Sequence, residues 1–127
     1  MSSVVVIEDE TGVREDVAEA LQEAGYEVRA AANGAEGLSL ILADPPDLVI
    51  CDRMMPVMSG DKMLATLRRE RPDMAKLPFI FLSALTDARD RHGVSDLAPT
   101  IYLGKPIDHR DLLRLVRDLI AVMPARS

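Results

Sequence analysis

Residues 4–9 read Val4-Val5-Val6-Ile7-Glu8-Asp9, an unbroken run of β-branched side chains that ends in two carboxylates. Successive side chains of a strand point to opposite faces, so a run without polar residues is typical of a strand buried on both faces, as in a parallel sheet. A helix is expected to follow, from about Thr11 to Ala24, because its apolar residues recur with a period near 3.6. Gly25 then supplies a stop signal for this helix.

The same alternation of a short apolar run and a helical pattern continues along the chain. Further strands are expected at about residues 26–30, 47–52, 77–83 and 100–103. The run at 26–30 alternates in polarity and is therefore expected at an edge of the sheet. Helices are expected after Asn33-Gly34, around Met63 to Leu67, at about 87–97, and after Pro106 with Asp108 as N-cap. This order predicts an α/β fold, with a doubly wound five-stranded parallel sheet and helices on both faces.

Length and composition are those of one globular domain. The chain has 127 residues, and we expect residues 1–123 to form the domain and residues 124–127 a tail or the start of a linker. The net charge of −6 and the 3% aromatic content argue against direct nucleic-acid binding, which needs a cationic surface. Neither a signal-peptide pattern nor a membrane-spanning run is found, so no membrane association is expected. Cys51 is the only cysteine, which suits a reducing, cytoplasmic location.

Polar residues stand at the points where the strands are expected to end. Glu8 and Asp9 follow the first strand, Asp52 ends the third, Ser83 ends the fourth, and Lys105 follows the fifth. The carboxyl ends of parallel strands meet at one edge, where ligands bind in such folds. Neighbouring carboxylates repel one another unless a cation neutralises them, and Mg²⁺ prefers such oxygen ligands. Asp52 also has the chemistry of a nucleophile for phosphoryl transfer, with Lys105 as a source of positive charge and Ser83 as a hydroxyl donor.

Four motifs in this order resemble the receiver domains of two-component response regulators, over essentially the whole length of the chain. They are the acidic pair Glu8-Asp9, the run Asp52-Arg53-Met54-Met55-Pro56 with Gly60 behind it, Ser83-Ala84, and Lys105-Pro106. Each motif is weak alone, but four of them in order, each at a strand end, form a specific pattern. The resemblance implies the flavodoxin-like, CheY-like strand order 2-1-3-4-5.

The resemblance implies that Asp52 is the phosphoacceptor. It also implies a Mg²⁺ (or Mn²⁺) site, with the metal held by the side chains of Glu8, Asp9 and Asp52, Glu8 through a water molecule, and by the backbone carbonyl of Met54. The donor of the phosphoryl group would be a sensor histidine kinase or a phosphotransfer protein. The domain would catalyse only its own phosphorylation and dephosphorylation, and it would signal to an unknown effector domain or downstream protein. A phosphorylation-linked homodimer is a further implication.

Other residues would bind the phosphoryl group or respond to it. By the resemblance, Ser83 is the switch hydroxyl, and Ala84 stays small so that the phosphoryl group can enter. Lys105 contacts that group and forms a cis peptide with Pro106. Tyr102 is the aromatic residue whose rotamer follows Ser83.

Two alternatives stay open on the residues alone. The first alternative to a phosphoacceptor receiver is a receiver-like interaction module that no longer takes phosphate, which absence of Mg²⁺ binding would favour. The second is a phosphatase of the haloacid-dehalogenase type. Such phosphatases also use an aspartate nucleophile, but they usually carry a second aspartate two residues on, where this chain has Met54. The chain also departs from the receiver pattern at residues 95–100, where Gly-Ala-Asp-type turns are common. Gly93 and Pro99 predict a short or distorted fourth helix there.

Overall fold

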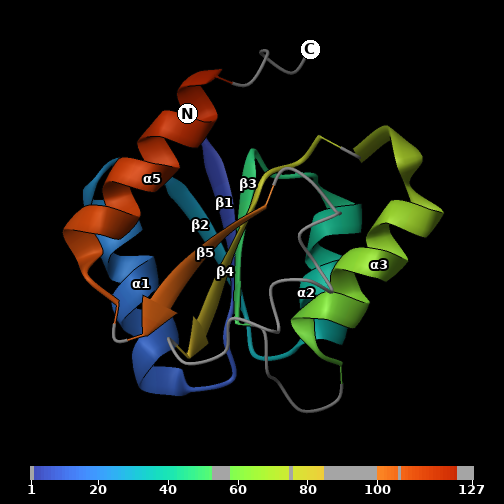
Figure 1. The fold of residues 1–127 in the computed structure, drawn as a ribbon, viewed down its shortest axis with the longest axis horizontal. Coiled ribbons are helices and arrows are strands. Elements are labelled where there is room, and N and C mark those ends of the chain that lie inside the picture. The colour runs from blue at the N-terminus through green and yellow to red at the C-terminus, as the bar shows by residue number, and fades with distance from the viewer. Residues whose placement is uncertain (1, 53–57, 75, 85–99, 106, 123–127) are drawn as a thin grey trace.

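The computed structural model describes residues 2–52, 58–74, 76–84, 100–105 and 107–122. Within these residues, five parallel strands form one sheet in the order β2-β1-β3-β4-β5 (Figure 1). The strands are β1 (Ser3–Ile7), β2 (Glu27–Ala31), β3 (Leu48–Asp52), β4 (Phe79–Ala84) and β5 (Thr100–Lys105). This order confirms both the predicted doubly wound parallel sheet and the position of β2 at its edge.

Helices cover both faces of the sheet (Figure 1). On one face lie α1 (Thr11–Glu23) and α5 (His109–Val122), and on the other lie α2 (Gly34–Ala43), α3 (Gly60–Glu70) and the short 3₁₀ helix η1 (Pro72–Met74). The helix expected at about 87–97 falls outside the described residues. Of the helices in the described ranges, none combines the length and the apolar character needed to cross a membrane.

Strand β1 shows why an unbroken apolar run was needed. Val5 and Ile7 pack into the core beneath α2 and α3, whereas Val4 and Val6 pack into the core beneath α1 and α5. All four side chains are fully buried. A polar side chain at any of these positions would lose its hydration, whichever face of the sheet it pointed to. The cost of this loss explains why the run contains no polar residue.

Three of the helices begin with a side-chain cap close to the carboxyl edge of the sheet. The Asn33 side chain accepts a hydrogen bond from the Glu36 amide at 2.9 Å, and Ser59 Oγ accepts one from the Lys62 amide at 3.2 Å. Asp108 Oδ1 accepts a hydrogen bond from the Arg110 amide at 2.8 Å, which confirms the predicted N-cap of α5. Gly25, with φ of 99°, confirms the predicted stop after α1.

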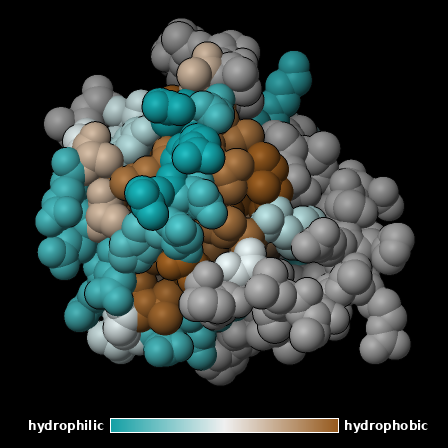
Figure 2. Space-filling model, turned by 60° about the vertical axis from the view of Figure 1, so that its left-hand side comes forward, coloured by the Kyte–Doolittle hydropathy of each residue, from teal (hydrophilic) through white to brown (hydrophobic). Residues whose placement is uncertain are grey.

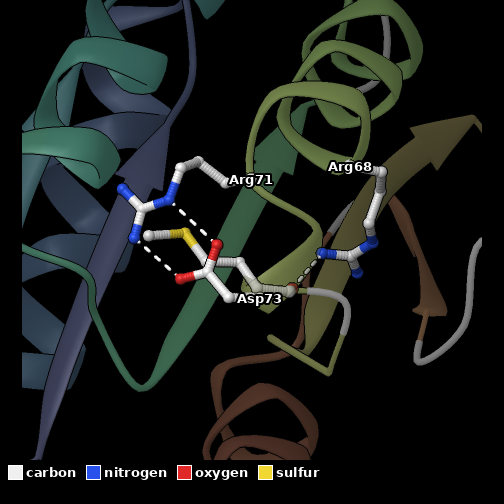
Figure 3. Close-up of polar contacts among 4 residues, drawn as sticks. Arg68, Arg71 and Asp73 are labelled. Atoms are coloured by element: carbon white, nitrogen blue, oxygen red, sulfur yellow. Dashed lines mark hydrogen bonds and ion pairs between the residues drawn. The ribbon is translucent and has the colours of Figure 1, made fainter.

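Arginine side chains hold the turn between α3 and β4 (Figure 3). Arg71 Nε and Nη2 donate to the two carboxylate oxygens of Asp73, at 2.9 and 2.8 Å. Arg68 donates to the backbone carbonyls of Met74, at 2.5 Å, and Leu77, at 3.0 Å. Its guanidinium carbon also lies 5.5 Å from the centre of the Phe79 ring. Arg68 thus connects the end of α3 to the start of β4.

Arg68→Ala is expected to lower the free energy of unfolding by about 2 kcal/mol, because two hydrogen bonds from a charged donor and one ring contact are lost. Urea denaturation followed by circular dichroism measures the change. The matched control is Arg69→Ala, since Arg69 is exposed on the same helix; a change within about 0.5 kcal/mol is expected there. Equal losses in the two variants would show that the contacts of Arg68 do not hold this turn.

Candidate functional site

The structure brings three carboxylates together at the carboxyl edge of the sheet. Glu8 and Asp9 follow β1, and Asp52 is the last residue of β3. These two strands are neighbours, with Ile7 paired to Cys51, so Glu8 and Asp52 occupy equivalent positions one step further on. One ligand atom from each of the three carboxylates lies within 4.8 Å of the others. The sequence prediction that these side chains meet is therefore confirmed.

The members of this acidic cluster differ in their exposure to water. Glu8 is 1% exposed and Asp52 is 5% exposed, whereas Asp9 is exposed. Buried carboxylates are rare without partners, because removing a charge from water is costly. Three carboxylates within 4.8 Å offer the hard oxygen donors that Mg²⁺ prefers, and the negative charge that it would neutralise. The cluster therefore fits a divalent cation, with Asp9 at the side open to solvent.

Backbone and side-chain bonds fix the turn that carries Glu8. The amide of Glu8 donates to the carbonyl of Ala31 on β2 at 3.0 Å, and Glu8 Oε1 accepts from the Glu10 amide at 3.2 Å. Arg14 Nη1 reaches back from α1 and donates to the Glu8 carbonyl at 2.8 Å. This contact was not predicted, because the sequence shows Arg14 only as a basic residue on the polar side of a helix.

Helix α3 packs closely against the phosphoacceptor candidate. A side-chain carbon on Gly60 would stand 2.7 Å from the Asp52 carbonyl oxygen and 2.9 Å from the ring of Phe81. The first of these positions belongs to backbone, which cannot rotate away. Gly60 thus lets the first turn of α3 lie directly against the end of β3. Its place in the sequence motif follows from this close approach.

Cys51 lies behind the acidic cluster and donates from Sγ to the Asp52 carbonyl at 3.2 Å. Burial raises the pKa of its thiol well above the usual value. The negative charges of Asp52, Glu8 and Asp61 raise the pKa of that thiol further. The thiol therefore stays protonated, as a donor must, and packs in the core beside Asp52.

The backbone places two further predicted segments at the same edge. Strand β3 pairs Asp52 with Leu82 of β4, so Ser83 and Ala84 lie just beyond it along β4. Strand β4 in turn pairs Ser83 with Gly104 and Ala84 with Lys105. The positions of Ser83, Ala84 and Lys105 at the carboxyl edge thus agree with the prediction. Their side chains, together with Met54 and the peptide between Lys105 and Pro106, lie outside the described residues.

Tyr102 lies in the aromatic part of the core between the sheet and α3. Its ring stacks on Phe81, with centroids 5.9 Å apart and planes at 26°. Phe81 stacks in turn on Phe79, with centroids 5.7 Å apart. The same Phe81 ring lies close to the start of α3, because Gly60 has no side chain there. Tyr102 is thus connected through Phe81 to the helix beside Asp52, while its predicted response to Ser83 stays a prediction.

Comparisons with known proteins agree with this architecture. The model of the response regulator receiver domain matches residues 4–117. The probable transcriptional regulator ycf29 of Pyropia yezoensis is 35% identical over 93% of this chain and 53% of its own length. The sensor histidine kinase TmoS of Ectopseudomonas mendocina is 36% identical over 94% of this chain and 12% of the kinase. The chain therefore spans about half, or less, of the length of these curated relatives.

A solved structure shows the same similarity in three dimensions. The chemotaxis protein CheY4 of Vibrio cholerae aligns with a TM-score of 0.86 and 29% identity, over 94% of this chain and 98% of the solved one. The family match covers both strands that carry the acidic cluster and the strand that ends in Lys105. The chain belongs to the family of response regulator receiver domains of two-component signalling.

Proposed function

We propose that this domain accepts a phosphoryl group on the carboxylate of Asp52 and passes the signal on through a changed surface. The donor is a sensor histidine kinase or a phosphotransfer protein. The observation that carries the proposal is the burial of Asp52 at the end of β3, with its carboxylate within 4.8 Å of those of Glu8 and Asp9. A carboxylate in this setting is largely shielded from water, and together with its two neighbours it offers the oxygen ligands for a cation that phosphoryl transfer needs.

The residues present fit a bound Mg²⁺ or Mn²⁺ ion. Glu8, Asp9 and Asp52 would hold it through their carboxylates, with Glu8 bridged by a water molecule, and Met54 would add its backbone carbonyl. Once bound, the cation neutralises carboxylate charge and polarises the phosphoryl oxygens. Arg14 supports the same site from behind, since it fixes the backbone carbonyl between the side chains of Glu8 and Asp9.

The transfer itself is a substitution at phosphorus. One oxygen of Asp52 forms the new bond to phosphorus, and the bond between phosphorus and the donor histidine nitrogen breaks. The electron pair returns to the imidazole, which leaves neutral because its other ring nitrogen carries a proton. In this proposal Lys105 balances the charge of the phosphoryl group, Ser83 donates a hydrogen bond to it, and Ala84 leaves room for its entry. Water later hydrolyses the acyl phosphate and restores Asp52.

The output is a shift between two conformations of the domain. The phosphoryl group itself carries about −1.5 to −2 charges, while the carboxylate of Asp52 gives up its own charge when the acyl phosphate forms. Ser83 and Tyr102 would move in response to the new group. Because Tyr102 stacks on Phe81, and Phe81 lies beneath the start of α3, a new rotamer of Tyr102 changes the packing of that helix. The proposal includes a cytoplasmic domain made of residues 1–123 and an effector domain or protein that reads the altered surface.

The test is to map the phosphoryl group after incubation with a small acyl-phosphate donor. We expect one phosphoryl group per chain, on the peptide that contains Asp52, and none in the Asp52→Asn variant. Asp118→Asn is the control, since Asp118 is exposed at the far end of α5, and it should be labelled like the wild type. A label elsewhere would contradict the proposal. So would many turnovers of a phosphate ester, supplied in place of the acyl-phosphate donor, without a lasting adduct; this second result would favour the phosphatase.

A further inference from the structure

Helix α5 forms one side of a basic hollow next to the end of α1. The hollow has a volume of about 420 Å³ and is lined by Ala24, Tyr26, Arg110, Leu113, Arg114 and Arg117. Tyr26 and Leu113 are half-buried and form its apolar floor, while the three arginines are exposed along its rim. Among the residues that the structure describes, no carboxylate lines this hollow. Its chemistry therefore suits a negatively charged surface with an apolar centre.

A second hollow of opposite charge lies beside the first, also between α1 and α5. It has a volume of about 250 Å³ and is lined by Asp16, Glu19, Ala20, Glu23 and His109. On α1, Glu23 of the second hollow is followed by Ala24 of the first, and on α5, His109 is followed by Arg110. The basic residues and the acidic residues thus lie on neighbouring parts of the same two helices. Figure 2, which brings the side of α1 and α5 forward, shows hydrophobic residues at the surface between hydrophilic ones.

The charges of these two hollows do not neutralise one another within the chain. In the ranges that the structure describes, the carboxylates of Asp16, Glu19 and Glu23 make no ion pair with α5. Arg117 pairs only with its neighbour Asp118, at 3.5 Å, and both side chains are largely exposed. Arg110 and Arg114 take part in no ion pair among the same residues. Within the described residues, Arg110, Arg114 and the three carboxylates of α1 therefore remain available to a partner, whereas Arg117 would have to exchange Asp118 for one.

The two charged stripes also match in length. The arginines are spaced i, i+4 and i+7 along α5, and the acidic residues i, i+3 and i+7 along α1. Each stripe therefore runs along one side of its helix for about 10 Å, or two turns. A surface with a basic half beside an acidic half becomes its own complement when it is rotated by 180°. A two-fold axis between the halves would set each arginine stripe against the acidic stripe of another copy.

We infer that the face formed by α1 and α5 is a docking surface for a second copy of this chain. An acidic partner of another kind would fit the arginine stripe of α5, but it would be repelled by the acidic stripe of α1 on the same face. A second copy satisfies both stripes at once and covers the apolar floor at Tyr26 and Leu113. Because the matching charges are exposed, we expect this dimer to be weak and concentration-dependent. None of the residues that line the two hollows belongs to the acidic cluster, so this inference does not rest on the proposed phosphorylation of Asp52.

Charge reversal tests this surface by sedimentation equilibrium of the whole chain. The wild type is expected to self-associate. Arg114→Glu alone, or Glu19→Arg alone, is expected to weaken association by about tenfold or more. Each substitution occurs in both copies of a two-fold dimer, so it places like charges opposite one another at two positions. An equimolar mixture of the two variants is expected to associate again, since each restores the missing charge for the other. Arg69→Glu, an exposed charge reversal on α3, is the matched control and should associate like the wild type.

The mixture separates this docking mode from other causes of association. Circular dichroism of each variant checks that the fold is kept, and the recovery in the mixture shows directly that both variants are folded. A wild type that stays monomeric at high concentration would overturn the inference. So would variants that associate like the wild type, or a mixture that stays as weak as its components.

Discussion

Mg²⁺ at a hundred times its dissociation constant is expected to raise the free energy of unfolding of this domain by about 2.7 kcal/mol. The reason is that the acidic cluster exists only in the folded chain, where three carboxylate ligand atoms lie within 4.8 Å of one another. The Asp9→Asn variant is expected to gain much less. Because Asp9 is exposed, its replacement removes a ligand and a negative charge without emptying a buried position.

The effect of Asp9→Asn on the free energy of unfolding should change sign when divalent cations are removed. In a chelator, Asp9→Asn is expected to be slightly more stable than the wild type, because one of three repelling charges is gone. Thermal unfolding with and without Mg²⁺ measures both arms. Glu10→Gln is the matched control, since Glu10 is exposed, adjacent in sequence and outside the cluster. A variant that gains as much from Mg²⁺ as the wild type would show that Asp9 is no ligand.

Gly60→Ala is expected to cost about 1–3 kcal/mol of stability and to slow phosphorylation of Asp52. The added carbon would stand 2.7 Å from the Asp52 carbonyl oxygen, so α3 and the end of β3 must separate. This separation moves the backbone that carries the phosphoacceptor and disturbs the contact with Phe81. Urea denaturation gives the loss of stability, and the rate of labelling by an acyl-phosphate donor gives the effect on the site.

Gly12 provides a contrast within the same chain. An alanine carbon there meets no atom within 4 Å, so Gly12→Ala is expected to stabilise α1 by up to about 1 kcal/mol. The same substitution thus has opposite signs at two glycines in the first turns of two helices. If Gly60→Ala is as harmless as Gly12→Ala, then close packing of α3 against β3 does not position Asp52.

Much of the architecture was predictable because burial leaves a strong mark on sequence. The run from Val4 to Ile7 packs alternately into two cores, and no polar residue could occupy it. The carboxylates that follow it and Asp52 meet because parallel neighbouring strands end at the same edge. The lengths of β4 and β5 were less predictable. They run to Ala84 and Lys105, beyond the predicted ends at 83 and 103, because backbone pairing continues past the apolar side chains.

Contacts to the backbone, and charges brought together by the fold, could not be predicted from the sequence alone. Arg14 donates to the backbone carbonyl of Glu8, and Arg68 donates to those of Met74 and Leu77. Every residue has a backbone carbonyl, so such an acceptor cannot be recognised from residue types. Both arginines look like ordinary surface charges on helices. The opposed charges of the α1 and α5 face are visible only once the fold sets the two helices side by side.

We propose that Asp52 takes a phosphoryl group in a reaction that depends on a divalent cation. Intact-mass measurement tests it most directly, after incubation of the wild type and Asp52→Asn with a small acyl-phosphate donor in Mg²⁺ or in a chelator. We expect a single phosphoryl adduct on the wild type in Mg²⁺, and none in the chelator or on Asp52→Asn. A folded wild type without an adduct in Mg²⁺, or with the same adduct in the chelator or on Asp52→Asn, would contradict it.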